Sequence, residues 1–259
     1  MNRIHHAEAI DVLRLQPTAS IDLIYTDPPF GTQGQQVLSR LKDGKVISEI
    51  GYSDRHEDYM AFLRPHLDEF KRVLKPTGTL YLHLDWHWSH YVKIALDEVF
   101  GRECFLNEVI WAYDFGGRGK RCWPKKHDTI LVYSRQPDQH IFNWDDIECI
   151  PYMAPGLQKD PARAAAGKVP TDVWWMSIVG TQAKERTGYP NQKPVKLIER
   201  AVLASSPVGG VILDPFAGSG TTGEVAYTNG RYFILADVSP WAQEVMQERF
   251  KEIEIDWFR

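Results

Sequence analysis

The segment Asp27-Pro28-Pro29-Phe30 follows directly on the apolar, β-branched run Ile21–Thr26. Proline fixes φ and lacks an N–H, so the Pro28 carbonyl is held in one direction beside the Asp27 carboxylate. These two acceptors match an exocyclic amino group, which offers two hydrogens, and the Phe30 ring offers a face on which a planar base can stack. The segment therefore predicts a socket for the amino edge of a flipped base. Turn formation after a strand is the alternative interpretation, in which Phe30 fills the core.

A second segment that could bind a ligand is Gly218-Ser219-Gly220-Thr221-Thr222-Gly223, which follows an apolar strand ending at Asp214. Its GxGxxG spacing permits close approach of the backbone to a ligand, and Asp237, about 20 residues on, can accept hydrogen bonds from ribose hydroxyls. A P-loop is excluded because no lysine follows the glycines at the required place. On this pattern alone, NAD or FAD and S-adenosylmethionine all remain open as ligands.

Both segments begin where a strand is expected to end, and in an open parallel sheet ligands bind beyond the carboxyl ends of the strands. Apolar runs predict strands at Ile21–Thr26, Thr79–Leu84, Glu108–Tyr113, Thr129–Tyr133, Gly210–Leu213 and Tyr232–Ala236. Helical patterns predict helices near Glu57–Leu74, His90–Phe100, Val195–Ser205, Thr221–Thr228 and Pro240–Ile253. Because strands alternate with helices, we expect an α/β fold with a mostly parallel sheet and helices on both faces.

The composition is that of a globular protein. The 259 residues are 43% hydrophobic and 25% charged, which is enough to bury a full core. Three scattered cysteines form neither a disulfide framework nor a CxxC metal site, and they suit a reducing compartment. No window approaches the roughly 18 apolar residues of a membrane span and no signal peptide is evident, so we expect a soluble, cytoplasmic protein. The net charge of −4 restricts any nucleic-acid contact to a local basic patch.

Such a patch occurs between two of the expected strands, around Trp123. Its basic residues are Arg118, Lys120, Arg121, Lys125 and Lys126. A cluster of this kind suits phosphate contacts, which contribute affinity without sequence information. A solvated charged hairpin is the alternative interpretation. A second polar loop, Thr32–Arg55, fits either a mobile flap over a site or a plain surface connection.

The alternation of strands and helices fails between Gln136 and Arg186. This segment contains prolines and the small-residue run "ARAAAGK", so it predicts an inserted lobe or long functional loops. The chain is thereby divided into residues 1–135, 136–186 and 187–259.

Taken together, the ordered blocks of this sequence resemble the amino-group DNA methyltransferases of the β arrangement, in which the base-binding DPP[YF] motif precedes the cofactor loop. The blocks are "TDPPFGT", "GTLYLHLDWHWSHYVKIALDEVFG", "NEVIWAY", "KKHDTILVYSR", "AKERTGYPNQKPVKLIERAVLASS", "LDPFAGSGTT" and "ADVSP". They run nearly from end to end of the chain and are similar above all to adenine-specific modification methylases. Asn191 departs from the threonine usual at its position, and Ala7-Glu8 stands where Gly-Asp is usual.

The resemblance implies a Rossmann-like, S-adenosylmethionine-dependent methyltransferase fold with a seven-stranded sheet and a circularly permuted motif order. One strand is reversed, formed by the hairpin of Glu108–Tyr113 and Thr129–Tyr133. Residues 1–135 and 187–259 become two parts of a catalytic domain, with a target-recognition insert at 136–186. The base-binding and catalytic residues implied are Asp27, Pro28, Pro29 and Phe30. The cofactor contacts implied are Asp214, Phe216, Gly218, Gly220, Thr221, Thr222, Asp237, Gln192, Lys193 and Pro194, with Lys193 as a partner for the methionine carboxylate.

The same resemblance implies site-specific methylation of double-stranded DNA, with the basic loop on the phosphates, and leaves open a homodimer and a cognate restriction enzyme. Adenine N6 and cytosine N4 both present amino groups, and only the resemblance favours adenine. Methylation at cytosine carbon 5 is disfavoured, because that chemistry needs a cysteine that usually follows proline, and Cys104, Cys122 and Cys149 follow other residues. A non-catalytic DNA-binding relative and an NAD-dependent oxidoreductase are the other classes considered.

The cluster "HLDWHWSH" invites a zinc interpretation through His83, His87 and His90. However, the run Thr79–Leu84 reads as a strand, so these histidines need not share a face as tetrahedral zinc requires. We therefore expect no metal site. Asp85, at the end of that strand, is the better candidate for the rim of a site.

Overall fold

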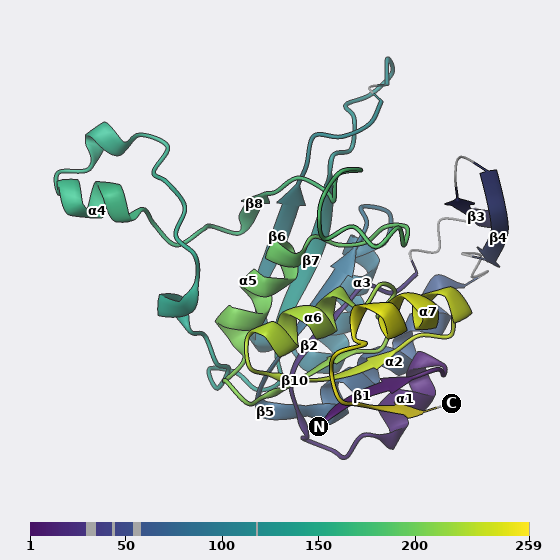
Figure 1. Cartoon of the computed structure of the whole chain (residues 1–259). Coiled ribbons are helices and arrows are strands. Elements are labelled where there is room, and N and C mark those ends of the chain that lie inside the picture. The colour runs from purple at the N-terminus through teal and green to yellow at the C-terminus, as the bar shows by residue number, and fades with distance from the viewer. Residues whose placement is uncertain (30–34, 43–44, 54–57, 118, 259) are drawn as a thin grey trace.

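The computed structural model describes residues 1–29, 35–42, 45–53, 58–117 and 119–258, with the backbone alone for residues 35–42 and 45–53. A nine-stranded sheet runs through the molecule, and helices cover both of its faces (Figure 1). Its strands are β1 (Asn2–His5), β2 (Ile21–Thr26), β5 (Leu74–Leu84), β6 (Phe105–Ala112), β7 (His127–Ser134), β8 (Val173–Trp175), β9 (Val211–Asp214), β10 (Tyr232–Ala236) and β11 (Ile255–Phe258). Their order is β11-β1-β10-β9-β2-β5-β7-β6-β8.

The sheet is parallel except for β7, which is antiparallel to both of its neighbours, β5 and β6. This confirms the single reversed strand expected in the hairpin of β6 and β7. The sheet is wider than the expected seven strands because the short strands β8 and β11 add one strand at each edge. Both are too short to give a clear apolar pattern in the sequence.

Two hydrophobic cores lie on the two faces of the sheet. The helices are α1 (Ala9–Leu15), α2 (Tyr59–Val73), α3 (Ser89–Phe100), α4 (Pro161–Ala166), α5 (Val195–Ser205), α6 (Thr221–Thr228) and α7 (Pro240–Arg249). Helices α1, α2 and α3 share one core with Ile24, and α5, α6 and α7 share the other with Leu23 and Tyr25. Alternate residues of β2 thus enter opposite cores, which explains why all six of its residues are apolar or buried.

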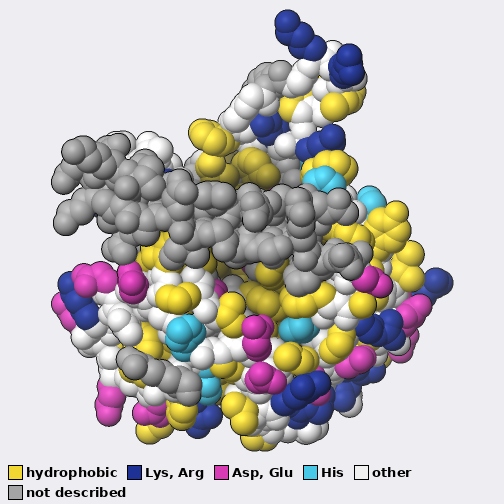
Figure 2. All heavy atoms as spheres, turned by 90° about the vertical axis from the view of Figure 1, so that its right-hand side faces the viewer, with side chains coloured by type: hydrophobic (Ala, Val, Ile, Leu, Met, Phe, Trp, Pro, Cys, Tyr) yellow, Lys and Arg dark blue, Asp and Glu magenta, His cyan; other side chains and the backbone are white. Residues whose placement is uncertain are grey.

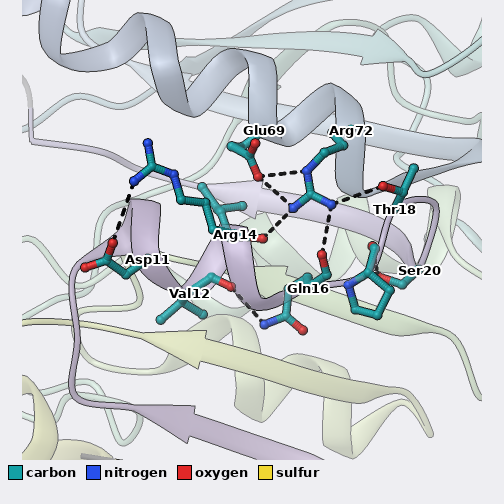
Figure 3. Close-up of polar contacts among 10 residues, drawn as sticks. Asp11, Val12, Arg14, Gln16, Thr18, Ser20, Glu69 and Arg72 are labelled. Atoms are coloured by element: carbon teal, nitrogen blue, oxygen red, sulfur yellow. Dashed lines mark hydrogen bonds and ion pairs between the residues drawn. The ribbon is translucent and has the colours of Figure 1, made fainter.

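Arg72, in the last turn of α2, joins this helix to the end of α1 (Figure 3). Its guanidinium donates to the carbonyl oxygens of Leu13 and Gln16 at 2.8 and 2.9 Å. It also donates to the Thr18 hydroxyl at 3.2 Å and to the Glu69 carboxylate at 2.6 Å. One side chain therefore binds two carbonyl groups at the end of α1, of which that of Leu13 also accepts from the backbone N–H of Gln16.

The segment Thr32–Arg55, expected as a loop, contains two strands instead. Strands β3 (Gln35–Lys42) and β4 (Lys45–Ser53) pair antiparallel and form a sheet of their own. The pair Asp43-Gly44 between two runs containing β-branched residues is a hairpin signal that outweighs the polar composition.

Among the described residues, none of the helices combines the length and the apolar character that a bilayer crossing requires.

Candidate active site

Three neighbouring strands end at one cavity. In the order β10-β9-β2, Asp237 follows β10, Asp214 ends β9 and Asp27 follows β2. The cavity has a volume of about 540 Å³, within the range of small-molecule sites. The residues predicted from the sequence that line it are Asp27, Pro28, Pro29, Gln192, Lys193, Asp214, Phe216, Gly218, Thr221, Thr222 and Asp237. The two sequence segments therefore do meet at the carboxyl edge of one sheet.

Two described residues that were predicted are not part of that lining. Gly220 is the N-cap residue of α6 and Pro194 is that of α5, so both lie where a helix begins. Phe30, the predicted stacking partner, lies outside the described residues.

Asp214 holds the start of the glycine loop. Its carboxylate accepts from the Thr222 hydroxyl at 2.6 Å and from the backbone N–H of Phe216 at 3.1 Å. Burial raises the pKa of Asp214 to about 7, although these hydrogen bonds act in the opposite direction. Asp214 therefore organises the loop from within the protein and is partly protonated near pH 7.

The two glycines of the loop adopt a left-handed conformation. Gly218 has φ +50°, and a Cβ there would lie 3.0 Å from the ring of Tyr189. Gly220 has φ +76°, and a Cβ there would lie 2.9 Å from Met246 of α7. At both positions a Cβ would lie too close to a neighbouring side chain, and the left-handed backbone also favours glycine.

Asp237 closes the loop from the neighbouring strand. Its carboxylate accepts from the backbone N–H groups of Gly218 and Ser239, each at 2.8 Å. Burial raises the pKa of Asp237 above its usual value. Each carboxylate oxygen has a second lone pair, so Asp237 can still accept from a ligand hydroxyl in the cavity.

The side chains of Asp27 and Lys193 form an ion pair across the cavity. Their side chains are 23% and 10% exposed, so the pair is largely withdrawn from solvent. The paired oxygen is Oδ2, whereas Oδ1 of Asp27 is buried and has no hydrogen-bond partner among the described residues. An unsatisfied buried acceptor at Asp27, in a cavity that Pro28 also lines, is what the predicted socket for an amino group requires.

The segment that carries Lys193 is held by its own side chains. Gln192 accepts from the backbone N–H of Thr187 at 2.9 Å and donates to the Glu185 carbonyl at 2.7 Å. The Glu185 carboxylate in turn accepts from the backbone N–H of Val195 at 2.8 Å. Gln192 lines the cavity, but its amide is used to hold the loop that leads into α5.

A buried polar chain crosses three strands behind Asp27. The Tyr25 hydroxyl lies 3.2 Å from Nδ1 of His83, and Nε2 of His83 lies 3.0 Å from Asp128, which also accepts from Tyr113. Burial and then the charges of Asp27, Asp214 and Asp128 raise the pKa of Tyr25 well above its ordinary value. Burial opposes ionisation of Asp128, but its interactions with His83 and Lys193 lower its pKa overall.

Two of the three histidines considered for zinc have other contacts, and His90 is exposed. His83 belongs to the polar chain, and the ring of His87 contacts the Asp85 carboxylate. Within the described part of the chain, no group of three His, Cys, Asp or Glu side chains could hold a metal ion.

Two residues that line the cavity, Glu8 and Tyr189, are not among the site residues predicted from the sequence. Glu8 follows β1, a strand of four residues that is too short to stand out as an apolar run. Tyr189 packs against Trp241, with ring centroids 5.4 Å apart, and reaches the cavity from an irregular loop. The position of Glu8 after a strand could have indicated that it lines the cavity, whereas no local sequence pattern indicates this for Tyr189.

The basic loop projects from the end of the β6–β7 hairpin, where Lys and Arg side chains gather at the tip (Figure 2). Lys120 and Arg121 are exposed. Lys125 lies over the Trp86 ring at 4.3 Å, and Lys126 donates to the Phe115 carbonyl, so these two have partners within the protein. Arg118 lies outside the described residues.

Part of the segment 136–186 forms an arm that extends away from the sheet and carries α4 (Figure 1). It returns to the body at β8, where Trp174 is buried and Trp175 is 74% exposed. Trp174 belongs to the core beneath α5, and Trp175 faces solvent.

Comparison with known proteins agrees with this geometry. A family model described as DNA methylase, for N6 and N4 methyltransferases, matches residues 21–248. The type II methyltransferase M.HpaI of Haemophilus parainfluenzae is 32% identical over 247 residues, which cover 95% of this chain and 73% of that protein. The DNA adenine methyltransferase YhdJ of Escherichia coli (strain K12) is 29% identical over 245 residues, which cover 91% of this chain and 78% of that protein.

Among solved structures, the SAM complex of M1.HpyAVI is similar in fold, with a TM-score of 0.65 and 18% sequence identity, covering 96% of this chain and 99% of that one. The family match begins at β2, which leads into Asp27, and extends beyond β10, which leads into Asp237. It therefore includes both segments that bound the cavity. The chain belongs to the DNA methylase family of N6 and N4 amino-methyltransferases.

Proposed function

We propose that this chain transfers the methyl group of S-adenosylmethionine to the exocyclic amino group of a base flipped out of double-stranded DNA, with adenine N6 as the favoured atom. The observation that carries this proposal is the single cavity bounded by both Asp27-Pro28-Pro29 and the Gly218 loop. As a member of the DNA methylase family, the chain is a DNA amino-methyltransferase and DNA is its substrate. Cytosine N4 is the alternative target, because both bases present an amino group to the same acceptors.

The residues of the cavity fit S-adenosylmethionine. Asp237 would accept from the ribose hydroxyls, and Lys193 would pair with the methionine carboxylate. The loop from Phe216 to Thr222 supplies the backbone surface between them. When bound, S-adenosylmethionine supplies a methyl group that is already activated by its sulfonium centre.

Asp27 and Pro28 act on the target base. An aromatic amine is a poor nucleophile because its lone pair is delocalised into the ring. Hydrogen bonds from its two hydrogens to the Asp27 carboxylate and the Pro28 carbonyl favour a pyramidal nitrogen and stabilise the charge that develops there. The enzyme forms no covalent bond to the base, so most of the catalysis is positioning.

The base must leave the duplex to reach Asp27, because an amino group within a base pair cannot enter the cavity. A mismatch at the target base should therefore bind more tightly than matched DNA, since extrusion costs less where pairing is already absent. Fluorescence of 2-aminopurine at the target position measures the extrusion directly. The predicted role of Phe30 is stacking on the extruded base, and Phe30→Ala should weaken binding to matched DNA.

Single-molecule sequencing of DNA from a host that expresses the protein tests the proposed function. We expect a modified adenine in one sequence context with the wild type and none with Asp27→Ala. Modification of cytosine N4 would select the alternative base, and unmodified DNA in both hosts would contradict catalysis. Stabilisation of the purified protein against heat by NAD and not by S-adenosylmethionine would favour an oxidoreductase instead.

Residues 136–186 are the proposed target-recognition region, with 1–135 and 187–259 as the two parts of the catalytic domain. Support comes from the projecting arm and from the exposed aromatic side chains of Trp144 and Trp175. Exchange of this segment with that of a relative should move the recognised sequence without changing the modified atom. Retention of the original sequence would contradict the assignment.

A homodimer and a cognate restriction enzyme belong to the same proposal, and light scattering of the purified protein tests the first. A cytoplasmic location is supported by the free cysteines Cys104, Cys122 and Cys149. Fractionation of expressing cells checks it.

A further inference from the structure

The cavity contains an imbalance of charge. Among its described lining residues, the acids are Glu8, Asp27, Asp214 and Asp237, and Lys193 is the only lysine or arginine. A ligand that carries a carboxylate therefore finds a single cationic partner in the described lining. That partner already forms an ion pair with Asp27.

The ion pair of Lys193 with Asp27 is largely buried, so breaking it has an energetic cost. Lys193 is 10% exposed in its side chain, so its ammonium group is poorly hydrated and depends on protein partners. Asp27 presents one oxygen to Lys193, while its other oxygen is buried without a partner among the described residues. The charge of Lys193 also reaches Asp128 behind the cavity, where it contributes to lowering the pKa of that carboxyl group.

We propose that Lys193 is a positioning residue that couples the two halves of the site, because the carboxylate of the bound cofactor and the carboxylate of Asp27 compete for the same ammonium group; this rests on the function proposed above. Without cofactor, Lys193 holds and neutralises Asp27. With cofactor bound, Lys193 turns to the cofactor carboxylate, and Asp27 becomes a stronger acceptor for the amino group of the base.

Competition follows from the chemistry of the groups. An ammonium group has three N–H donors and can bridge two carboxylates, but its single charge is then shared between them. Coupling free energies are reciprocal, so if the bound cofactor weakens the ion pair of Lys193 with Asp27, removal of that ion pair must tighten cofactor binding by the same free energy. The coupling can therefore be measured without DNA.

The test uses two adenosine ligands in equilibrium titrations of the full chain. S-adenosylhomocysteine carries the amino-acid carboxylate, and 5′-methylthioadenosine lacks it. We expect Asp27→Asn to tighten S-adenosylhomocysteine about fivefold, because the amide cannot form an ion pair with Lys193, and to leave 5′-methylthioadenosine unchanged. In the Lys193→Met background, Asp27→Asn should change neither ligand.

The conservative variant Lys193→Arg keeps the charge and should retain part of the coupling, which separates a charge effect from loss of packing. Thermal unfolding of each variant establishes that it is folded, and Lys193→Gln replaces Lys193→Met if the latter is not.

The outcomes are distinct. An unchanged affinity of Asp27→Asn for S-adenosylhomocysteine, equal changes for both ligands, or an effect that persists without Lys193 would each overturn the coupling. Failure of the wild type to bind either ligand would instead contradict the proposed function. Binding of both ligands without coupling would leave the proposed function standing.

Discussion

The carboxylate of Asp237 accepts a hydrogen bond of 2.8 Å from the backbone N–H of Gly218, which ties the end of β10 to the glycine loop after β9. The acid predicted to bind ribose therefore also shapes the loop that lies beside the ligand. Asp237→Ala should weaken S-adenosylmethionine binding by about 1–3 kcal/mol, the value for hydrogen bonds to a charged group. Isothermal titration measures this change.

Asp237→Asn is the variant to compare with Asp237→Ala, because its amide oxygen can still accept the hydrogen bond from the Gly218 N–H. We expect it to retain more of the thermal stability than Asp237→Ala does. Glu252→Ala, an exposed substitution away from the cavity, serves as the control. An unchanged dissociation constant in Asp237→Ala would place the ribose contact elsewhere.

Asp27→Ala should abolish methyl transfer without weakening cofactor binding, because its carboxylate acts on the amino group of the base. Transfer of a labelled methyl group to DNA and titration with S-adenosylmethionine measure the two quantities separately. A loss of cofactor affinity in proportion to the loss of activity would show that Asp27 acts on the cofactor instead.

Asp214 should make stability depend on pH. Its pKa is raised from 3.8 to about 7 by burial, so the folded protein binds this proton more tightly than the unfolded chain does. Its contribution is therefore full below pH 3.8 and is lost as pH rises through about 7. Asp214→Asn resembles the protonated acid and should reduce the loss of stability between pH 5 and pH 8, on the order of a few kcal/mol.

Urea unfolding of the wild type and Asp214→Asn at the two pH values checks this expectation. Asp68→Asn, on an exposed position of α2, should follow the wild type at both. The same dependence on pH in Asp214→Asn as in the wild type would mean that Asp214 titrates in its ordinary range.

Arg72→Ala should destabilise the fold by about 2–3 kcal/mol, because its guanidinium satisfies the end of α1 and pairs with Glu69. Arg64→Ala on the same helix is the matched control. Arg64 pairs with Glu98 at 2.6 Å, but both side chains are well exposed, so its loss should cost less than about 1 kcal/mol. Equal losses in urea unfolding would contradict the capping role of Arg72.

Lys120 and Arg121 should contribute phosphate contacts. Replacing either with alanine should lower the salt dependence of DNA binding by about one unit of the log–log slope, without changing the recognised sequence. Lys126 has a backbone partner at Phe115, so Lys126→Ala should act on the hairpin itself and change the slope less. Lys251→Ala, in a distant exposed pair with Glu248, is the control. Fluorescence anisotropy across a salt series measures the slopes.

The sequence predicts the elements that have strong apolar patterns. β2 and β10 have their expected bounds, and so do α5 and α6, because five to eleven residues of clear periodicity separate strand from helix. β1, β8 and β11 are only three or four residues long, and their pairing depends on neighbours that are remote in the sequence. Local pattern contains little information about such strands.

The residues of the candidate site likewise fall into those that the sequence predicts and those that it does not. Asp27, Asp214 and Asp237 could be predicted because each lies at or directly after the end of a strand, and the ends of neighbouring parallel strands lie at one edge of the sheet. The ion pair of Lys193 with Asp27 could not, since it joins residues that are 166 positions apart and depends on the path of an irregular loop. Likewise, Tyr189 reaches the cavity through the packing of its ring on Trp241.

The position of β1 in the sheet constrains how the protein folds. Arg3 pairs with Ile234 on one side and with Asp256 on the other, so the first strand has no partner among residues close to it in sequence. β2 likewise lies between β5 and the late strand β9. Contacts of such long range slow folding and expose apolar strands during synthesis. A fragment that ends before β9 should therefore aggregate, because β1 and β2 would lack the late strands with which they pair.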